Sequence, residues 1–596
     1  MLTQEKINAA RQAVERVTGQ AAPDARVGEG PGLTLRILDG KTEIIAEDAN
    51  ALARGYFLLA EAADAGRPPE ELRQERHFAA CGIMLDMSRN AVLTVGAVCR
   101  VLDRMAALGM NLLLLYMEDT YTIPEYPSFG RLRGRYTPEE LRQMDDHAAA
   151  LDIDLVPCIQ TLGHMAQFLQ WDSSAPLRDQ RDILLIDSPD TEKLIEAAIR
   201  SLRSCLRTRR IHIGMDEAEG VGLGRYYLQH GAQDRFELMN RHVRLVADIC
   251  RKYGFAPMMW SDMYFKLGSA RQQYYDPEAH VPDEVIAGLP DIGWCYWDYY
   301  HTDPAVYDHM LREHERMGKA VFAGGIWTWS GFLPNIKRTA ATMSPGLRVC
   351  AAHRVDTVFA TMWGDDGAET DPFLALPQLT VFSEACWQGT EAEGEERLGA
   401  YLTGIPEKAS RAIAEFYLSE RDFRTGKSLI WCDPLLPTAA LNEPLAPALD
   451  RYRQALDRLA GETPEIRYAR LCFRLALQKG EWLMEARERY LAQDRAWLAR
   501  AVTHTLPALR DTCDALMRAH RTLWERDCKR AGWEVLNLRY GGQIARLSEA
   551  EEQIRRWLDG GIDRIAELDE EPTDDRRYAA SFYHALATPN STLSGI

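Results

Sequence analysis

Eight short apolar runs alternate with longer amphipathic stretches through the middle of this chain, and this alternation limits the possible folds more than any other feature. The runs span residues 82–88, 111–118, 154–161, 210–217, 256–262, 292–300, 320–329 and 357–366. Helical patterns such as AVLTVGAVCRVLDRMAALG and TPEELRQMDDHAAALD lie between them. Eight successive strand–helix units are typical of an α/β fold of the (β/α)8 TIM-barrel type. A doubly wound open sheet is the alternative, but no glycine-rich phosphate loop follows the first run.

Changes of pattern divide the 596 residues into three predicted parts. Residues 1–75 show two short strand patterns around the Asp39–Gly40 turn and a helix from about Asp48, which together predict a small α/β N-terminal domain. Residues 76–398 contain the eight strand–helix units and form the predicted catalytic barrel. Residues 399–596 carry leucines at helical spacing with arginine and glutamate between them, which predicts an α-helical C-terminal region.

Charge, hydropathy and cysteine usage narrow the classes of partner. The chain has 88 acidic and 70 basic residues, which gives a net charge of −18. Nucleic acids and anionic membranes bind positively charged surfaces, so we expect neither as a partner. No apolar run is long enough to span a membrane. The twelve cysteines occur singly and the N-terminus, MLTQEKINAARQAVERV, lacks an apolar signal core, so we expect free thiols and a cytoplasmic location. The large helical region is compatible with a homodimer.

Polar and aromatic side chains end nearly every predicted strand. In a (β/α)8 barrel the active site is built at these C-terminal strand ends. Each residue alone has a simple structural explanation, such as a helix cap for an aspartate or core packing for a tryptophan. Together they predict a sugar pocket, where carboxylates and arginine hold hydroxyls and indole rings stack on the sugar. The residues are Asp86, Arg89, Glu118, Asp119, His164, Asp216, Glu217, Trp260, Asp262, Tyr296, Trp297, Tyr299, Trp329, Trp363 and Asp365.

The same acidic strand ends could hold a metal ion. Glu118, Asp119, His164, Asp216 and Glu217 offer the oxygen and nitrogen ligands that divalent cations use. However, the first strand has no H-x-H motif, and no histidine pair stands at ligand spacing elsewhere. The tryptophans also suit a carbohydrate more than a hydrated cation. We therefore expect no metal and no cofactor, and a metal-dependent hydrolase remains an alternative.

The segment HIGMDEAEG, residues 212–220, places Asp216 and Glu217 side by side. Glycosidases with a protein nucleophile hold two carboxylates on opposite sides of the scissile bond. Two neighbours at one strand end reach a pocket from the same side, so neither can attack the far face while the other protonates the leaving oxygen. A 2-acetamido group on the sugar can supply the nucleophile instead, through its carbonyl oxygen. One carboxylate then serves as the acid and the other orients the acetamido N–H.

The sequence resembles family 20 glycoside hydrolases, the β-N-acetylhexosaminidases. HIGMDE is similar to the family's H-x-G-x-D-E signature, GIMLDMSRN to its first strand, LYMED to its second, TLGHM to its P-G-H segment and FATMWGDD to its closing W-x-E strand. This resemblance implies an exo-acting enzyme that removes terminal β-linked GlcNAc or GalNAc from an oligosaccharide or glycoside by retaining, substrate-assisted hydrolysis. A catalytically inactive barrel that binds amino sugars is the alternative from a different class.

The resemblance assigns catalytic roles to five residues. Glu217 would be the general acid/base and Asp216 would hold the acetamido nitrogen. His164, with Glu118 or Asp119, would form a relay that supports the acid. The family usually shows Asp-Asp after the second strand, so which of these two carboxylates pairs with the histidine stays open.

The resemblance also assigns the sugar-binding residues. Arg89 would bind the ring hydroxyls O3 and O4, and Asp365, where a glutamate is common, would bind O4 or O6. The family's acetamido-binding tyrosine usually comes from the seventh strand, which has none here, so we expect Tyr296 to supply that hydroxyl, with Tyr299 as its rival. The pocket would be lined by four tryptophans, Trp260, Trp297, Trp329 and Trp363.

Overall fold

The computed structural model describes residues 2–38, 40–68, 71–389, 395–436, 445–570 and 582–588. The chain folds as two compact units, each made of several segments. The first unit comprises Met1–Ile326, Thr339–Met362 and Gln378–Thr403, and the second comprises Trp327–Arg338, Trp363–Pro377 and Gly404–Ile596. The segments that follow the last two barrel strands therefore belong to the second unit. The domain limits expected from the sequence, at residues 75 and 398, stay predictions.

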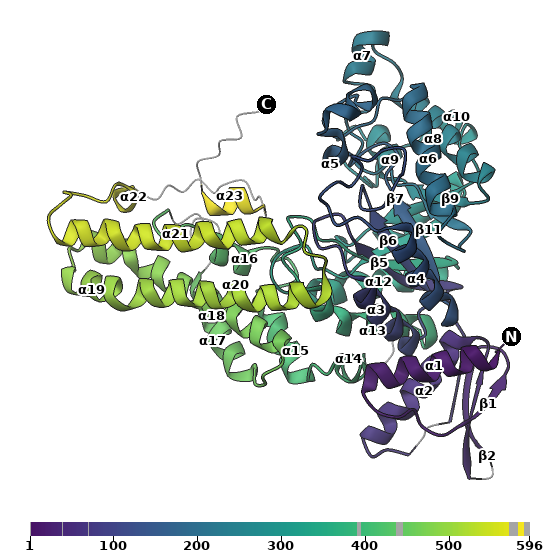
Figure 1. Ribbon diagram of the computed structural model, residues 1–596, viewed down its shortest axis with the longest axis horizontal. Coiled ribbons are helices and arrows are strands. Elements are labelled where there is room, and N and C mark those ends of the chain that lie inside the picture. Colours follow the sequence, from purple (N-terminus) through teal and green to yellow (C-terminus); the bar gives the residue numbers. More distant parts are fainter. Residues whose placement is uncertain are drawn as a thin grey trace. The chain divides into compact units, whose positions relative to one another are not determined.

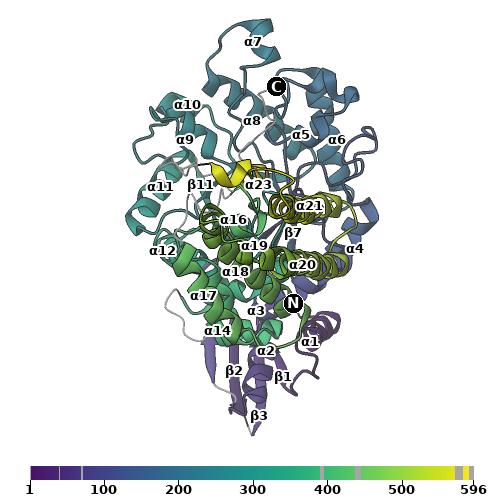
Figure 2. The same cartoon turned by 90° about the vertical axis from the view of Figure 1, so that its left-hand side faces the viewer.

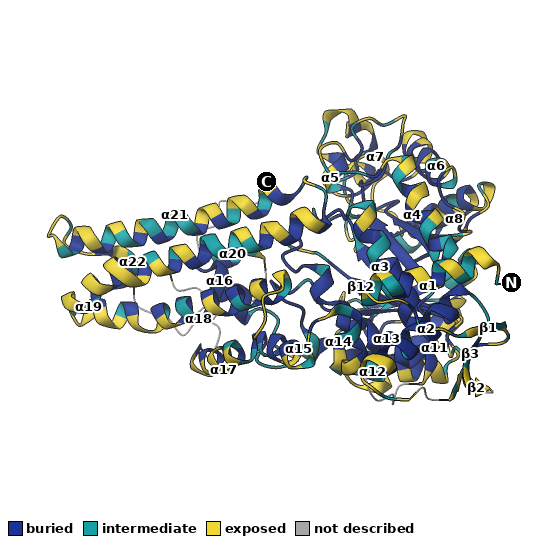
Figure 3. Ribbon diagram, turned by 60° about the horizontal axis from the view of Figure 1, so that its bottom comes forward, coloured by how far each residue is buried: buried dark blue, intermediate teal, exposed yellow. Residues whose placement is uncertain are grey.

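A closed barrel of eight parallel strands forms the centre of the first unit, which confirms the predicted (β/α)8 fold (Figure 1). The sheet closes between the last and the first of these strands, with Thr357 paired to Ala80. Buried residues fill the strands because both faces are covered, by the barrel interior and by the helices (Figure 3). The strands are β5 (Ala80–Asp86), β6 (Leu112–Met117), β7 (Asp154–Ile159), β8 (Arg210–His212), β9 (Ala256–Trp260), β10 (Gly293–Trp297), β11 (Lys319–Gly325) and β12 (Thr357–Met362).

The helices between the barrel strands begin and end at the signals that the sequence carries. Thr94 caps the first of them and Gly109 ends it in a left-handed conformation, with φ of 73°. Thr137 and Glu140 form a reciprocal capping box at the start of the next helix. The longer helices are α3 (Val95–Leu108), α4 (Pro138–Ala150), α6 (Pro189–Arg203), α8 (Arg235–Lys252), α11 (Pro304–Met317), α12 (Ile336–Ala352) and α13 (Leu379–Trp387); short ones are α5 (Ala166–Leu169), α7 (Arg225–His230), α9 (Asp262–Gly268) and α10 (Asp283–Ala287).

A small α/β module precedes the barrel within the first unit (Figure 2). Its sheet has the order β1-β3-β2-β4, with β1 (Arg26–Glu29), β2 (Leu33–Leu38), β3 (Lys41–Ala46) and β4 (Leu72–Gln74). β2 and β3 pair antiparallel, as a hairpin requires, although Asp39 of the predicted turn lies outside the described residues. Helices α1 (Gln4–Thr18) and α2 (Ala49–Asp64) pack against each other and against α3.

One buried ion pair ties this module to the barrel. Arg54 of α2 and Glu384 of α13 meet at 2.8 Å, and neither side chain has any solvent exposure. The Nη1 and Nη2 atoms of Arg54 both donate to the carboxylate, and Nη1 also donates to the carbonyl oxygen of Leu108 at 3.1 Å. A bidentate pair of this kind, with its remaining donors satisfied, is the arrangement in which burial of two charges is tolerated.

The second unit is built mainly of long helices that pack along one another, as the leucine spacing predicted. α18, α20 and α21 lie side by side, and each buries one stripe of its surface (Figures 1 and 3). No helix in the described part of the chain is long and apolar enough to cross a membrane. The helices are α15 (Glu407–Ile413), α16 (Thr425–Trp431), α17 (Leu445–Arg458), α18 (Pro464–Leu491), α19 (Arg495–Arg500), α20 (Leu506–Asp527), α21 (Trp533–Leu558), α22 (Ala566–Asp569) and α23 (Tyr583–Ala587), while α14 (Glu395–Thr403) belongs to the first unit.

Several barrel strands end earlier than their apolar runs predicted. The fourth predicted strand spans residues 210–217, but β8 stops at His212. The backbone turns there because Gly214, Met215 and Glu217 adopt positive φ angles of 71°, 71° and 50°. The residues after each strand are therefore loop residues at the barrel rim, and they carry the side chains expected to act on a substrate.

Candidate active site

His164 contacts both adjacent carboxylates at the rim of the barrel. Its Nε2 atom lies 3.2 Å from Oδ2 of Asp216 and 3.5 Å from Oε2 of Glu217. The Asp216 side chain is only 9% exposed, whereas that of Glu217 is 46% exposed. The structure thus brings together three residues expected from the sequence and gives the two carboxylates different environments, one enclosed and one open to solvent.

The charges of this group depend on one another. Burial lowers the pKa of His164, but the negative charge of Asp216 and the close contacts with both carboxylates outweigh burial and raise that pKa well above its usual value. Burial alone would raise the pKa of Asp216, but the charged histidine and a hydrogen bond from Gln160 hold it below its usual value. An ionised aspartate is therefore maintained in a nearly enclosed position.

Gln160 fixes the orientation of Asp216, a role that sequence reasoning missed. Its Nε2 atom donates to Oδ1 of Asp216 at 2.6 Å and to the hydroxyl of Tyr116 at 2.9 Å. Its Oε1 atom accepts the backbone N–H of Met215 at 3.1 Å, so one amide holds both the side chain and the loop that carries it. The sequence did carry a signal for it: Gln160 is a polar side chain directly after β7, and the rule that active-site residues follow the barrel strands had already identified His164 in the same segment.

Asp262 supports the backbone of Glu217 from the end of the neighbouring strand. Its Oδ2 atom accepts the N–H of Glu217 at 2.9 Å, and the side chain is fully buried. Burial and the charge of Asp216 raise the pKa of Asp262 well above its usual value. This hydrogen bond stabilises Glu217 in its left-handed conformation, which a residue with a side chain rarely adopts.

Arg89 lies between two carboxylates and an aromatic ring. Its guanidinium group is 3.3 Å from Asp86 and 3.4 Å from Glu118, and it stands over the ring of Tyr116 at 4.9 Å from the centroid. The side chain retains 18% exposure. Such a group matches the expected recognition of sugar hydroxyls.

Glu118 and Asp119 have different surroundings, which bears on the expected relay to His164. Asp119 pairs with Arg133 at 3.3 Å, whereas Glu118 accepts the hydroxyl of Tyr116 at 3.2 Å. Burial raises the pKa of Glu118, and the charge of His164 acts to lower it. Glu118 therefore interacts electrostatically with the histidine. The direct contacts of the imidazole are nevertheless with Asp216 and Glu217, and the relay expected from the sequence gains no hydrogen bond.

The aromatic side chains of β9 and β10 divide between the barrel interior and its exterior. Trp260 is fully buried, with its ring 4.2 Å from that of His212. Trp297 is partly exposed and stacks on Tyr299 at 5.4 Å. Successive residues of a strand point to opposite faces, so Tyr296 points outward when Trp297 points to the rim.

Tyr296 is consequently in the wrong place for its expected role. It is fully buried, its ring lies 5.0 Å from that of His314 of α11, and its hydroxyl donates to Asp298 at 2.5 Å. The expectation that Tyr296 binds the acetamido group therefore needs correction: the strand register directs this side chain under α11. Tyr299, its rival, is also buried and stacks against Trp297.

Tyr274, which follows α9, is a candidate that the strand-end rule did not identify. Its ring lies 5.7 Å from that of Trp297, and its hydroxyl donates to Glu219 at 2.5 Å. Burial, the hydrogen bond to Glu219 and the charge of Glu217 all raise the pKa of Tyr274, so this hydroxyl remains protonated near the carboxylates. The residue stands in a loop and not at a strand end, and no sequence signal marked it.

The remaining expected residues, Trp329, Trp363 and Asp365, belong to the second unit. Trp329 stacks on Trp327 with ring centroids 4.3 Å apart. The carbonyl oxygen of Trp363 accepts the Thr328 hydroxyl at 2.7 Å, and Asp365 is exposed. Their assigned roles in sugar binding stay predictions.

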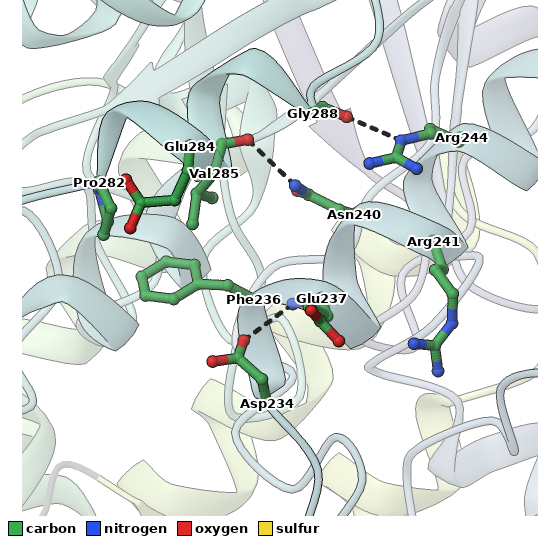
Figure 4. A pocket seen from close by; sticks show the side chains of 10 residues that line it. All are labelled: Asp234, Phe236, Glu237, Asn240, Arg241, Arg244, Pro282, Glu284, Val285 and Gly288. Atoms are coloured by element: carbon green, nitrogen blue, oxygen red, sulfur yellow. Dashed lines mark hydrogen bonds between the residues drawn. The ribbon is translucent and has the colours of Figure 1, made fainter.

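A separate hollow lies on the outside of the barrel, between α8 and α10 (Figure 4). Asn240 donates to the carbonyl oxygen of Val285 at 3.0 Å, and Arg244 donates to that of Gly288 at 2.7 Å. Asp234 accepts the N–H of Glu237 as the cap of α8. These polar groups are engaged in joining the two helices, and none of the expected catalytic side chains lines the hollow. Within the described residues, no group of three or more histidine, cysteine or acidic side chains could hold a metal ion.

Comparison with known families gives two matches along the chain. Residues 78–279 match the model of the glycosyl hydrolase family 20 catalytic domain, and residues 444–580 match that of the glycoside hydrolase 20C C-terminal domain. The first match contains Asp216, Glu217 and His164. The second lies in the helical second unit.

Two curated relatives are similar to part of the chain. Hexosaminidase D of Bos taurus is 27% identical over 205 residues, which cover 32% of this chain and 55% of that protein. Hexosaminidase D of Homo sapiens is 27% identical over 203 residues, with 32% and 39% covered. The chain thus spans about half, or less, of the length of these relatives.

Solved structures share the fold at low sequence identity. The chitobiase of Flavobacterium johnsoniae matches 98% of this chain and 94% of its own, with a TM-score of 0.52 and 16% identity. The N-acetyl-beta-hexosaminidase of Streptomyces plicatus matches 68% of this chain and 90% of its own, with a TM-score of 0.50 and 17% identity. At such identities the likeness concerns the fold alone.

Proposed function

We propose that this chain, which belongs to glycoside hydrolase family 20, is an exo-acting β-N-acetylhexosaminidase that removes terminal non-reducing β-linked GlcNAc or GalNAc. The proposed reaction retains the anomeric configuration and uses the 2-acetamido oxygen of the substrate as the nucleophile. The observation that carries the proposal is the pair of adjacent carboxylates, both in contact with His164 and unequal in exposure.

The unequal environments suit two different tasks in one reaction. Glu217 has an open side chain and can donate a proton to the glycosidic oxygen, then take one from the water that completes hydrolysis. Asp216 is enclosed and held ionised, so it can orient the acetamido N–H and stabilise the positive charge that develops on that group. The carbonyl oxygen of the acetamido group attacks C1 as the leaving oxygen departs, and an oxazolinium ion results. Water then opens this ring at C1.

Two neighbouring side chains hold Asp216 in place before a substrate binds. Gln160 and His164 engage its two oxygens, at 2.6 and 3.2 Å. A carboxylate already fixed in this way needs no reorganisation when charge develops next to it, which is the main source of electrostatic catalysis. His164 also lies close to Glu217, so its charge acts on both carboxylates.

We propose that the hydroxyl of Tyr274 donates the hydrogen bond that the acetamido oxygen accepts. Its protonated hydroxyl stands close enough to Glu217 for that charge to raise its pKa, and its ring lies beside that of Trp297. Tyr296, buried under α11, has no comparable access. In the structure this O–H donates to Glu219, so a bound substrate would have to draw it away. Its donation to the acetamido carbonyl oxygen would then orient that oxygen for attack on C1.

Inhibition by a thiazoline that mimics the cyclic intermediate tests the mechanism. We expect this compound to bind far more tightly than GlcNAc, because enzymes bind analogues of the transition state and of intermediates much more tightly than substrates. Aryl β-glucosides without the acetamido group should be hydrolysed at a negligible rate. Equal rates on the aryl glucoside and the aryl N-acetylglucosaminide, or a trapped glycosyl–protein adduct, would contradict the proposal.

Three narrower parts of the proposal have their own tests. Paired rates on aryl GlcNAc and aryl GalNAc substrates decide between the two sugars, because only the orientation of O4 differs. A cytoplasmic location is supported by the twelve cysteines, all of which are free, and cell fractionation tests it. A homodimer is tested by sedimentation of the purified protein.

A further inference from the structure

Four charged side chains of the second unit form a closed cluster, which we call the ion-pair cluster: Asp366, Glu369, Lys427 and Arg539. Nζ of Lys427 lies 2.9 Å from Oδ2 of Asp366 and 2.9 Å from Oε2 of Glu369. Nη2 of Arg539 lies 2.8 Å from Oδ1 of Asp366, and its Nη1 lies 2.8 Å from Oε1 of Glu369. Each cation thus bridges both carboxylates, and the four charges balance.

The ion-pair cluster is nearly excluded from water. The side chains of Lys427 and Glu369 are 1% and 2% exposed, and those of Arg539 and Asp366 are 11% and 12% exposed. The indole N–H of Trp431 adds a hydrogen bond of 2.6 Å to Glu369. Charges this deeply buried are held only where their partners are complete.

The two carboxylates and the two cations come from different parts of the second unit. Asp366 and Glu369 belong to the loop after β12, whereas Lys427 stands on α16 and Arg539 on α21. Nη1 of Arg539 also donates to the carbonyl oxygen of Asp366 at 2.7 Å, so the arginine holds the loop backbone as well. The cluster therefore fixes the loop to two helices of the C-terminal region.

This loop has a conformation that needs such external support. Gly367 and Ala368 have φ angles of +92° and +54°, and their N–H groups donate to the carbonyl oxygens of Asp365 and Gly364 at 2.6 and 2.7 Å. A left-handed alanine is unfavourable by itself, so contacts elsewhere must stabilise the turn. A Cβ atom at Gly367 would meet the guanidinium group of Arg539 at 3.4–3.5 Å, which shows how closely the arginine covers the turn.

The same loop carries two residues expected to bind the sugar. Trp363 follows Met362, the last residue of β12, and Asp365 immediately precedes the first carboxylate of the ion-pair cluster. Asp365 is exposed, whereas the carboxylate of its neighbour Asp366 is held by two cations.

We propose that Lys427 and Arg539 are positioning residues for substrate binding: the helical C-terminal region holds, through the ion-pair cluster, the loop that presents Trp363 and Asp365 to the sugar. This inference rests on the proposed function. It gives the region that matches the 20C C-terminal domain a part in the reaction, besides its contribution to stability. Neither cation touches the substrate in this scheme.

Arg539→Gln tests the inference, with Arg546→Gln as the matched control. Arg546 also lies on α21 and also pairs with a buried carboxylate, Asp433, at 2.5 Å, but that carboxylate is outside the loop. We expect Arg539→Gln to raise KM for an aryl N-acetylhexosaminide by roughly tenfold or more and to change kcat little, since ground-state and transition-state binding are lost together. Arg546→Gln should lower the melting temperature without raising KM.

A second readout separates positioning from a general loss of stability. Asp365 is expected to bind O4 or O6, so the effect of Arg539→Gln on KM should largely vanish on the deoxy analogue that lacks the hydroxyl in question. Arg539→Lys, which keeps the charge but not the two-pronged geometry, should restore part of the affinity. If Arg539→Gln does not fold, the comparison of Arg539→Lys with the wild type on the 4-deoxy and 6-deoxy substrates serves the same purpose.

Different results would overturn the positioning role and the proposed function. Similar losses of melting temperature in both variants with unchanged KM, or an equal rise of KM on the natural and both deoxy substrates, would overturn the positioning role. Failure of the wild-type chain to hydrolyse any aryl N-acetylhexosaminide would instead overturn the proposed function. In that case the affinity for GlcNAc, measured by calorimetry for the wild type and both arginine variants, decides on the positioning role alone, and absent binding overturns both.

Discussion

Replacement of Asp216 by asparagine removes one negative charge from the proposed active site while preserving the shape of the side chain. In the structure this carboxylate lies 3.2 Å from Nε2 of His164 and accepts a hydrogen bond of 2.6 Å from Gln160. A carboxylate so enclosed interacts strongly with any positive charge that forms beside it. The oxazolinium ion of the proposed mechanism is such a charge.

A hydrogen-bonding separation between Asp216 and the oxazolinium ion of the proposed mechanism sets the size of the expected effect. Two unit charges about 3 Å apart, in an effective dielectric constant of about 20, interact by about 5 kcal/mol. The amide oxygen of asparagine retains part of this attraction through its dipole, so we expect a loss of about 3–4 kcal/mol in the transition state. That corresponds to a fall in kcat of roughly 10²- to 10³-fold, the range seen when one preorganised group is removed.

Steady-state kinetics on aryl GlcNAc and aryl GalNAc provide the measurement. The inhibition constant of the thiazoline should rise in parallel with the fall in kcat, because the same charge stabilises both the inhibitor and the intermediate. Circular dichroism establishes that the Asp216→Asn variant is folded. A folded variant that loses less than about tenfold in kcat, or one that binds the thiazoline as the wild type does, would refute the electrostatic role of Asp216.

Three further changes have distinct expected results. The pKa of His164 is raised in the folded state, so its contribution to stability is complete below the pKa of the unfolded chain and is lost as pH rises through the higher folded pKa. Urea midpoints should therefore fall with rising pH more steeply in the wild type than in His164→Gln. Gly214→Ala should lower the free energy of unfolding by about 2–4 kcal/mol in urea titrations, because φ is +71° and the added Cβ would lie 2.6 Å from the carbonyl oxygen of Ile159. A loss below about 1 kcal/mol would contradict this expectation. Tyr274→Phe should lower kcat/KM at least about tenfold on aryl N-acetylhexosaminides, whereas Tyr296→Phe should leave it unchanged, and the reverse order would restore the assignment to Tyr296.

The barrel could be predicted because its information is local and repeated. Each strand is a short apolar run buried on both faces, and α3 and α4 begin at their own caps, Thr94 and Thr137. The antiparallel pairing of residues 33–38 with 41–46 followed from a turn signal between two short strands. Such signals do not depend on distant parts of the chain.

The direction of individual side chains could not be predicted in the same way. Tyr296 and Trp297 are neighbours in a strongly aromatic segment, and the sequence of this segment does not indicate which of the two side chains faces the rim of the barrel. A shift of one residue exchanges the two faces of a strand, so the register with β9 and β11 decides the matter. Tyr274 was missed for a related reason, because a loop residue reaches the site only through the path of the folded backbone.

Residues that act through others were also beyond sequence reasoning. Gln160 and Asp262 stand at strand ends, but their importance lies in the hydrogen bonds they make to Asp216 and to the backbone of Glu217. The ion-pair cluster has the same character, since it joins residues that are far apart in the sequence. Neither residue type nor spacing distinguishes such side chains from ordinary polar residues.

The early end of β8 answers why two adjacent residues can serve one reaction. On a regular strand Asp216 and Glu217 would point to opposite faces, and only one could reach His164. The strand stops at His212, the backbone takes positive φ angles at Gly214, Met215 and Glu217, and both carboxylates then lie within 3.5 Å of the same imidazole. Left-handed residues with side chains are unfavourable, and here the N–H groups of Met215 and Glu217 donate to Gln160 and Asp262, which stabilises them. The irregular backbone therefore brings the two carboxylates together, and a loop relaxed to a regular strand would separate the proposed acid from the residue proposed to orient the acetamido group.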